Sequence, residues 1–309
     1  SIFSLASPAL AQSAYQPITV DPEAAGTTVT LTGRDLSIED VVAVARHGAK
    51  VRFAPEVYAT NAARRELIAQ GDEEGIAIYG VNRGAGALRE QERRPQPGTE
   101  SDGNPARYGA LPEIHEEALV RAFLVIHANH MPYGTGEQDY LESILALLNR
   151  RVTPVMYSRG SLSEGDLFIF NNYQATLKGR GFAYYEGQRM PAAEALAKAG
   201  LKPFEGHIPH LTTNAYTDAI AALLVDEGRH ALEWADMALA IDLIGMNSSL
   251  TPMAPPVQQE RPFPWLNWQA DKMLTILRGS YLFEDDGDRI LQDPESMRAS
   301  YIRLGSAWR

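Results

Sequence analysis

The sequence predicts a mainly α-helical protein with a small mixed α/β region near its N-terminus. Two segments, 112–128 and 138–149, place apolar residues three and four positions apart, which is the spacing of one helix face. Residues 214–246 are rich in alanine and leucine with few breakers, so a single helix of about 50 Å is expected there. The alternating β-branched residues of 27–32 predict a short strand.

The other expected elements are shorter or irregular. Asp35 is expected to cap one helix and Gly71 to end another. Residues 80–112 contain many Gly, Pro and Arg without a sustained period, which predicts a long loop. The remaining expectations are helices over 36–46, 61–70 and 191–199, a strand over 182–185 and a turn at 186–188.

Composition excludes several classes of function. The chain has 309 residues and a formal net charge of -11, so it lacks the cationic excess that a nucleic-acid partner requires. No window approaches the roughly 18 consecutive apolar residues of a membrane span, so no membrane partner is expected. The sequence contains no cysteine, which excludes disulfides, thiolate metal sites and a cysteine nucleophile.

The first residues suggest export. Ala9-Leu10-Ala11 follows a short apolar stretch, and A-x-A is the pattern found at secretory cleavage sites. Residues 1–26 are therefore interpreted as a signal-peptide remnant or a flexible extension. We expect a periplasmic or secreted protein, with a cytoplasmic location as the alternative.

Four separated stretches occur in an informative order. They are Tyr79–Gly86 (YGVNRGAG), Val152–Leu162 (VTPVMYSRGSL), Gly165–Leu167 together with Tyr185–Leu196 (YEGQRMPAAEAL), and Gln292–Arg298 (QDPESMR). Together they resemble the histidine and aromatic amino-acid ammonia-lyases, over roughly residues 27–309.

The resemblance implies a fumarase/aspartase-like helical bundle, usually a homotetramer whose sites are built from several subunits. Residues 27–212 would form the active-site region and 213–309 a long-helix region that is truncated relative to the family. Members of the family use an electrophilic methylidene-imidazolone ring, which forms from an Ala-Ser-Gly tripeptide by cyclisation and dehydration.

The chain departs from the family at this tripeptide. The family pattern GSVGASGDL is one residue longer than GSLSEGDL, and alignment on Gly165 makes the tripeptide Ser163-Glu164-Gly165. The residue that must lose water is then Glu164, which has no β-hydroxyl. We therefore expect no imidazolone, and Glu164 becomes a candidate acid/base group.

The resemblance also supplies candidate site residues. Tyr79 matches the catalytic base, His127 an active-site histidine, and Arg298 the arginine that binds a substrate carboxylate. Each has an ordinary alternative: packing for the tyrosine, a buried core position for the histidine and a structural ion pair for the arginine. Glu295, in place of a family tyrosine, is a further catalytic candidate; the other substrate-binding candidates are Asn82, Arg83, Gln292 and Asn214, the last with Thr212 as its alternative.

Two histidine pairs raise the question of a metal. His127 and His130, like His207 and His210, are three residues apart, which on a helix is one face. With a carboxylate they would suit a divalent metal, although such pairs also arise by chance. No cofactor is expected otherwise.

Three functions stay open. The first is a lyase or isomerase that performs acid/base chemistry on a small amino-acid-like carboxylate. The second is a non-catalytic pseudoenzyme or a structural partner of a paralogue, and the third is a conventional ammonia-lyase. Because long apolar helix faces would stay uncovered in a monomer, we expect a homo-oligomer, a complementary chain that supplies the missing C-terminal half, or both.

Overall fold

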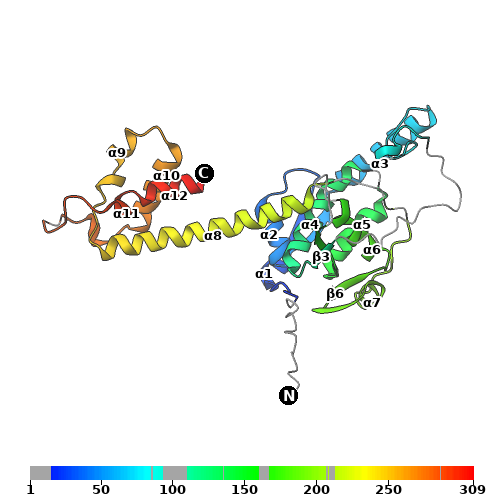
Figure 1. Ribbon diagram of the computed structural model, residues 1–309, viewed down its shortest axis with the longest axis horizontal. Coiled ribbons are helices and arrows are strands. Elements are labelled where there is room, and N and C mark those ends of the chain that lie inside the picture. Colours follow the sequence, from blue (N-terminus) through cyan, green and yellow to red (C-terminus); the bar gives the residue numbers. More distant parts are fainter. Residues whose placement is uncertain are drawn as a thin grey trace, which may run out of the picture. The chain divides into compact units, whose positions relative to one another are not determined.

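The computed structural model describes residues 15–84, 86–92, 110–134, 136–159, 167–206, 208, 213–285 and 287–309. The chain forms two compact units, Ser1–Leu223 and Leu224–Arg309, which divide within helix α8 (Ala215–Gly245). Each unit has its own hydrophobic core, and Figure 1 shows their elements in chain order. None of the described helices is apolar over enough length to span a bilayer.

Unit 1 begins with a short helix α1 (Pro22–Ala25) and a β-α-β arrangement. Strands β1 (Thr28–Leu31) and β2 (Lys50–Phe53) pair in parallel, and helix α2 (Ile38–Arg46) connects them. The expected strand and helix are confirmed, but the expected cap is wrong. Ser37 caps α2 through a reciprocal capping box with Asp40, because its hydroxyl is placed to accept from the third helical N–H.

Helix α3 (Pro55–Glu73) is longer than the sequence predicts. Pro55 occupies its first turn, where the missing N–H costs no hydrogen bond, and Gly71 lies inside the helix rather than beyond it. Gly71 is buried, and a Cβ there would lie 3.1 Å from Ile78, so its packing against the following loop explains the glycine. The end of α3 and the residues to Glu92, with the 3-10 turn η1 (Gly86–Leu88), project from the rest of the unit (Figure 1).

Helices α4 (Glu117–His130) and α5 (Gln138–Arg150) form the centre of unit 1. Residues 120–129 of α4 are all buried, so this helix is covered on every side, whereas α5 buries one face. The helix predicted from residue 112 starts later because strand β3 (Ala110–Glu113) occupies its first residues. A 3-10 turn η2 (Met131–Tyr133) follows α4.

Two small antiparallel sheets and two helices complete unit 1. Strand β3 pairs with β5 (Tyr157–Arg159), and β6 (Phe182–Tyr185) pairs with β4 (Thr153–Pro154) and β7 (Gln188–Pro191). The predicted turn at 186–188 is confirmed: Glu186 and Gly187 both have positive φ, as a tight hairpin requires. Helix α6 (Leu167–Leu177) was not predicted, whereas α7 (Ala192–Lys198) was.

The regular elements that the structure describes in unit 2 are all helices. Unit 2 contains the second part of α8 followed by η3 (Thr251–Met253), α9 (Pro255–Gln259), α10 (Pro264–Ile276), η4 (Tyr281–Phe283), α11 (Glu295–Arg298) and α12 (Ser300–Trp308). Helices α10 and α12 pack closely, because Gly305 lets α12 approach the Trp265 carbonyl: a Cβ there would lie 2.9 Å from that oxygen. The prediction of one long helix over 214–246 is confirmed by α8.

Candidate functional site

The loop that carries Tyr79 is organised by the side chain of Asn82. Asn82 Oδ1 accepts from the Ile78 N–H at 2.7 Å, and Nδ2 donates to Asp72 Oδ1 at 2.7 Å and to the Ile76 carbonyl at 2.8 Å. Asp72 lies in the last turn of α3, so this amide ties the loop to the helix end. The structure thus places Asn82 in the scaffold of the loop, with both amide hydrogens used.

Tyr79 itself is accessible. Its side chain is 62% exposed, and its hydroxyl accepts a hydrogen bond from the Gly86 N–H at 2.8 Å. Gly80 and Gly86 both have positive φ, so the loop that follows the tyrosine turns at both positions. Arg83 follows in the same loop, and its guanidinium lies 3.6 Å from the carboxylate of Glu92. Tyr79, Asn82 and Arg83 therefore share one small lobe.

His127 lies in the core, on the last turn of α4. It is 1% exposed, its Nε2 lies 2.7 Å from the Tyr173 hydroxyl, and its ring stacks on Phe123 with centroids 5.6 Å apart. Tyr173 in turn lies 2.7 Å from the Tyr140 hydroxyl. Burial lowers the pKa of His127 to about 3, so the imidazole is neutral at physiological pH.

His130 and Asn214 are close to the junction with α8. His130 is partly exposed, its Nδ1 lies 3.3 Å from the Thr213 hydroxyl, and burial lowers its pKa. Asn214 is exposed, and its carbonyl accepts from the Asp218 N–H in the first turn of α8. The part of the chain that the structure describes contains no group of three or more metal-ligating side chains, and His207 and His210 lie outside it.

The remaining candidates belong to unit 2. Gln292 and Arg298 are exposed, and Glu295 makes an ion pair of 2.6 Å with Arg303. The buried carboxylate of Asp293 accepts from the Ser249 N–H at 2.7 Å, which anchors this segment to the end of α8. The structure therefore places Glu295 and Arg298 on one short helix, α11, and Gln292 just before it.

Residues 160–166, with Glu164, lie outside the described residues. The candidates among the described residues fall into four groups: the Tyr79 lobe, His127 in the core of unit 1, His130 and Asn214 near the start of α8, and the α11 segment of unit 2. Sequence reasoning missed Asp72, Tyr140 and Tyr173, because phenol and carboxylate contacts across 10–46 residues have no local signature.

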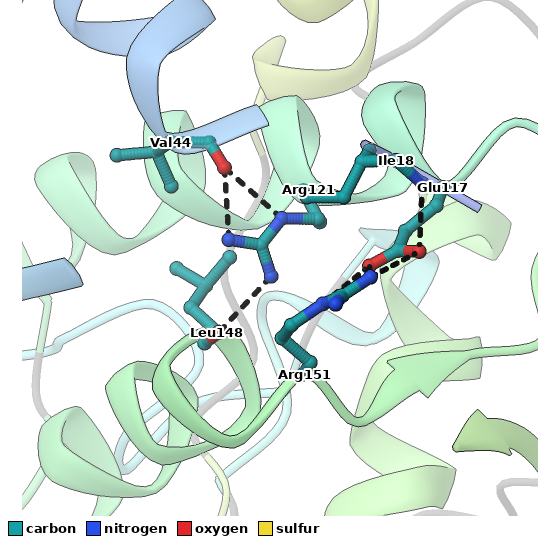
Figure 2. Close-up of polar contacts among 6 residues, drawn as sticks. All are labelled: Ile18, Val44, Glu117, Arg121, Leu148 and Arg151. Atoms are coloured by element: carbon teal, nitrogen blue, oxygen red, sulfur yellow. Dashed lines mark hydrogen bonds and ion pairs between the residues drawn. The ribbon is translucent and has the colours of Figure 1, made fainter. Parts of the chain in front are cut away.

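A cluster of charged side chains, Glu117, Arg121 and Arg151, anchors α4 within unit 1 (Figure 2). Arg121 is buried and donates to the carbonyls of Val44 and Leu148, at the ends of α2 and α5. Glu117 accepts from the Ile18 N–H at 3.1 Å and pairs with Arg151 at 3.2 Å. These contacts fix the helix on which His127 lies.

Comparison with known proteins supports the motif-based prediction. The profile of the family described as aromatic amino acid lyase matches residues 36–309. A histidine ammonia-lyase from Sorangium cellulosum is 33% identical over 282 residues, an alignment that covers 87% of this chain and 55% of the relative. One from Gloeobacter violaceus is 32% identical over 288 residues, covering 88% and 55%. The chain thus spans about half the length of the curated relatives it matches.

Solved structures agree on the fold. The crystal structure of the ergothioneine-degrading enzyme ergothionase from Treponema denticola is similar with a TM-score of 0.80 and 26% identity, covering 90% of this chain and 58% of that one. The histidine ammonia-lyase from Trypanosoma cruzi matches with a TM-score of 0.74 and 19% identity, covering 91% and 54%, which shows the fold alone. The predicted mainly helical, ammonia-lyase-like fold is confirmed, and the chain belongs to the aromatic amino acid lyase family.

Proposed function

We propose that this chain is part of a lyase or isomerase that moves protons on a small amino-acid-like carboxylate without an imidazolone ring. The observation that carries the proposal is the sequence Ser163-Glu164-Gly165 at the place of the family's Ala-Ser-Gly. Formation of the exocyclic methylene requires the loss of a β-hydroxyl, and glutamate has none. The tripeptide does not fit the prosthetic group, so no step is assigned to it.

Tyr79 is the best-supported base in this proposal. A general base must be reachable by the substrate, and the exposed Tyr79 hydroxyl meets this requirement. The hydrogen bond from the Gly86 N–H holds this hydroxyl in place. Asn82 is then a residue that positions the base, in addition to or in place of the substrate contact that the resemblance implies.

Arg298 is the candidate group for the substrate carboxylate. It is exposed at the end of α11, and among the described residues it makes no ion pair. A planar guanidinium binds a carboxylate through two parallel hydrogen bonds. Glu295, one turn earlier, pairs with Arg303, and its carboxylate is a candidate acceptor of substrate protons.

The proposal also includes association of this chain with one or more other chains. In unit 2, Trp234, Met237, Ile241 and Ile244 follow a 3-4-3 spacing on α8 and are all exposed, the tryptophan to 77%. An exposed apolar stripe of this kind typically marks a surface that another chain buries with its own apolar side chains. We propose that a further copy, a chain that supplies the C-terminal half, or both cover it. Trp234→Glu should leave the chain monomeric in light scattering, whereas Glu233→Gln should not change its association.

The decisive experiment combines mass and activity. The intact chain should have its unmodified mass, without the loss of two waters that accompanies ring formation, and should lack the ring's near-ultraviolet absorption. Once the protein is assembled with its partner chains, a panel of amino acids and 2-hydroxy acids should reveal proton exchange or elimination. Tyr79→Phe and Glu164→Gln should abolish it, whereas Tyr133→Phe, which alters an exposed tyrosine outside the Tyr79 lobe, should not.

A mass deficit of two waters would instead identify a conventional ammonia-lyase. A second candidate, a non-catalytic pseudoenzyme, is favoured by the engagement of Asn82 and His127 in structural hydrogen bonds. It predicts binding of a carboxylate that survives both Tyr79→Phe and Glu164→Gln. Export is proposed from the Ala9–Ala11 pattern, and N-terminal sequencing of the secreted protein tests it.

A further inference from the structure

A surface groove of about 550 Å³ lies against α5 in unit 1. Its lining comes from the start of β2, from α5 and from the turn that follows α7. A volume of this size is usual for a small-molecule site. The lining of this α5 groove includes Lys50, Glu142, Ala146, Asn149, Arg150 and Leu201, none of which is a candidate for the proposed active site.

The ammonium of Lys50 is held at a fixed place in the groove. The side-chain amide of Asn149 accepts from the Val51 N–H at 2.8 Å and donates to the Val51 carbonyl at 2.9 Å, so the end of α5 is tied to β2. The Lys50 Nζ in turn donates to the Asn149 carbonyl at 2.8 Å. Because an ammonium has three hydrogens, two remain for a ligand.

Arg150 adds a second positive charge at the same end of the groove. Its side chain is exposed and makes no ion pair within the part of the chain that the structure describes. The negative end of the α5 dipole already has cationic partners, because the Leu148 and Asn149 carbonyls accept from Arg121 and Lys50. The five N–H donors of Arg150 are therefore available to a ligand.

The acidic residue of the lining lies away from these two cations. Glu142 precedes Arg150 by eight residues, which is about 12 Å along a helix axis, and its carboxylate accepts from the Tyr58 hydroxyl. Half-buried Ala146 lies between them on α5, and half-buried Leu201 adds apolar surface. The groove is thus positive at the end of α5, apolar beside it and negative farther along the helix.

We propose that the α5 groove binds a small organic anion, with a carboxylate or phosphate head at Lys50 and Arg150 and an apolar body over Ala146 and Leu201. A guanidinium offers two parallel N–H donors to either head group, and the fixed ammonium adds a point charge. A second anionic group at the far end of the ligand would approach Glu142, so a singly headed anion fits best. The proposal is independent of the proposed reaction, because the groove shares no residue with its candidate site.

Isothermal titration calorimetry of the full chain with 3-phenylpropionate tests the proposal. Phenyl phosphate carries the other head group, and the tighter of the two anions identifies which head the groove prefers. The uncharged 3-phenylpropanamide should bind at least about tenfold more weakly, because it lacks the charge-assisted hydrogen bonds. Failure of both anions to bind at millimolar concentration, or equal binding of the amide, overturns the proposal.

Variants place the binding in the groove. Arg150→Gln should weaken it at least about tenfold while the fold is kept, because this side chain is exposed. Ala146→Glu should abolish binding by adding a carboxylate to the lining. Lys198→Gln, which removes an exposed cation of α7 outside the lining, is the matched control and should leave the affinity unchanged.

Arg298 is also proposed to bind a carboxylate, so the titration is repeated in Arg298→Gln. Binding of the anion that persists in Arg298→Gln and is lost in Arg150→Gln supports the α5 groove. Equal affinities of Arg150→Gln and Lys198→Gln, or loss of all binding in Arg298→Gln, contradict it. Turnover by the assembled protein has no bearing on these results, since no reaction is measured.

Discussion

Arg121 donates two hydrogen bonds to one carbonyl oxygen, that of Val44, from Nε at 3.0 Å and Nη2 at 2.8 Å. Its third bond goes from Nη1 to the Leu148 carbonyl at 3.0 Å. Both carbonyls lie in the last turn of a helix, where backbone acceptors lack intrahelical partners. One buried guanidinium on α4 therefore donates to backbone carbonyls in the last turns of both α2 and α5 (Figure 2).

Arg121→Met should be destabilising, because it removes both donors to the Val44 carbonyl and leaves the Leu148 carbonyl with only the Arg151 N–H at 3.3 Å. We expect a loss of about 1–3 kcal/mol in the free energy of unfolding of unit 1. Arg121→Lys should recover only part of it, since an ammonium cannot reproduce the planar fork. Hydrogen exchange of α2 and α5 measures the effect. Arg150→Met, an exposed neighbour on α5, should change stability by less than about 0.5 kcal/mol, and an equal effect of both variants would refute this role.

Glu117→Gln should release the N-terminal segment from unit 1. The carboxylate of Glu117 accepts from Ile18 N–H and pairs with Arg151, while Tyr15 stacks on Tyr184 with centroids 3.8 Å apart. Charged hydrogen bonds of this kind contribute about 1.5–3 kcal/mol, so exchange of residues 15–20 should accelerate by roughly one to two orders of magnitude.

Glu116→Gln is the matched control for this change, because Glu116 is the exposed neighbour of Glu117 and its side chain makes no capping bond. Peptides that begin at Tyr15 should exchange at the unmodified rate in this variant. Similar acceleration in both variants would mean that the buried charge is not what holds the segment.

Unit 1 should lose stability as the pH falls below the pKa of an ordinary histidine, about 6.5. Burial lowers the pKa of His127 to about 3, so between about pH 6.5 and 3 the unfolded chain binds a proton that the folded chain does not. The stabilisation is complete above about pH 6.5 and decreases on acidification, by at most about 1.4 kcal/mol per pH unit.

Hydrogen exchange of α4 from about pH 7 to about pH 4, corrected for intrinsic rates, measures this slope. His127→Gln should make it shallower. His230→Gln, which alters an exposed histidine of unit 2, should leave it unchanged. A slope that is insensitive to His127→Gln would show that other groups control the acid response.

Lys272→Met should destabilise unit 2 by isolating a buried carboxylate. Asp236 is fully buried, lies 2.6 Å from Lys272 Nζ and accepts from Gln269 and from the indole N–H of Trp308. Loss of its cationic partner should cost about 3–5 kcal/mol. All four tryptophans belong to residues 224–309, so their fluorescence during urea unfolding reports on this unit alone.

The double variant Asp236→Asn/Lys272→Met removes both charges and should regain most of that stability. Because Lys272 Nζ also lies 3.9 Å from the centroid of the Trp308 ring, the single and double variants should both shift tryptophan emission. If the double variant is as unstable as the single one, the cost arises from packing rather than from the unpaired charge.

The sequence by itself determined the elements with a clear period and the order of the family motifs. The apolar rows of 138–149 and 214–246 form α5 and α8 nearly as expected. The absence of a β-hydroxyl at the central residue of Ser163-Glu164-Gly165 follows from the sequence alone. Helix α6 was missed because an apolar run without a period favours neither helix nor strand.

Only the tertiary structure decided what the polar side chains do. Asn82 organises a loop, His127 is bonded to Tyr173, and Arg121 joins two helix ends that lie 27 and 77 residues away along the chain. Periodicity is a local property, whereas the partner of a buried polar group depends on which segments packing brings together. Local pattern therefore determined where the helices form, and burial determined which donors and acceptors had to meet.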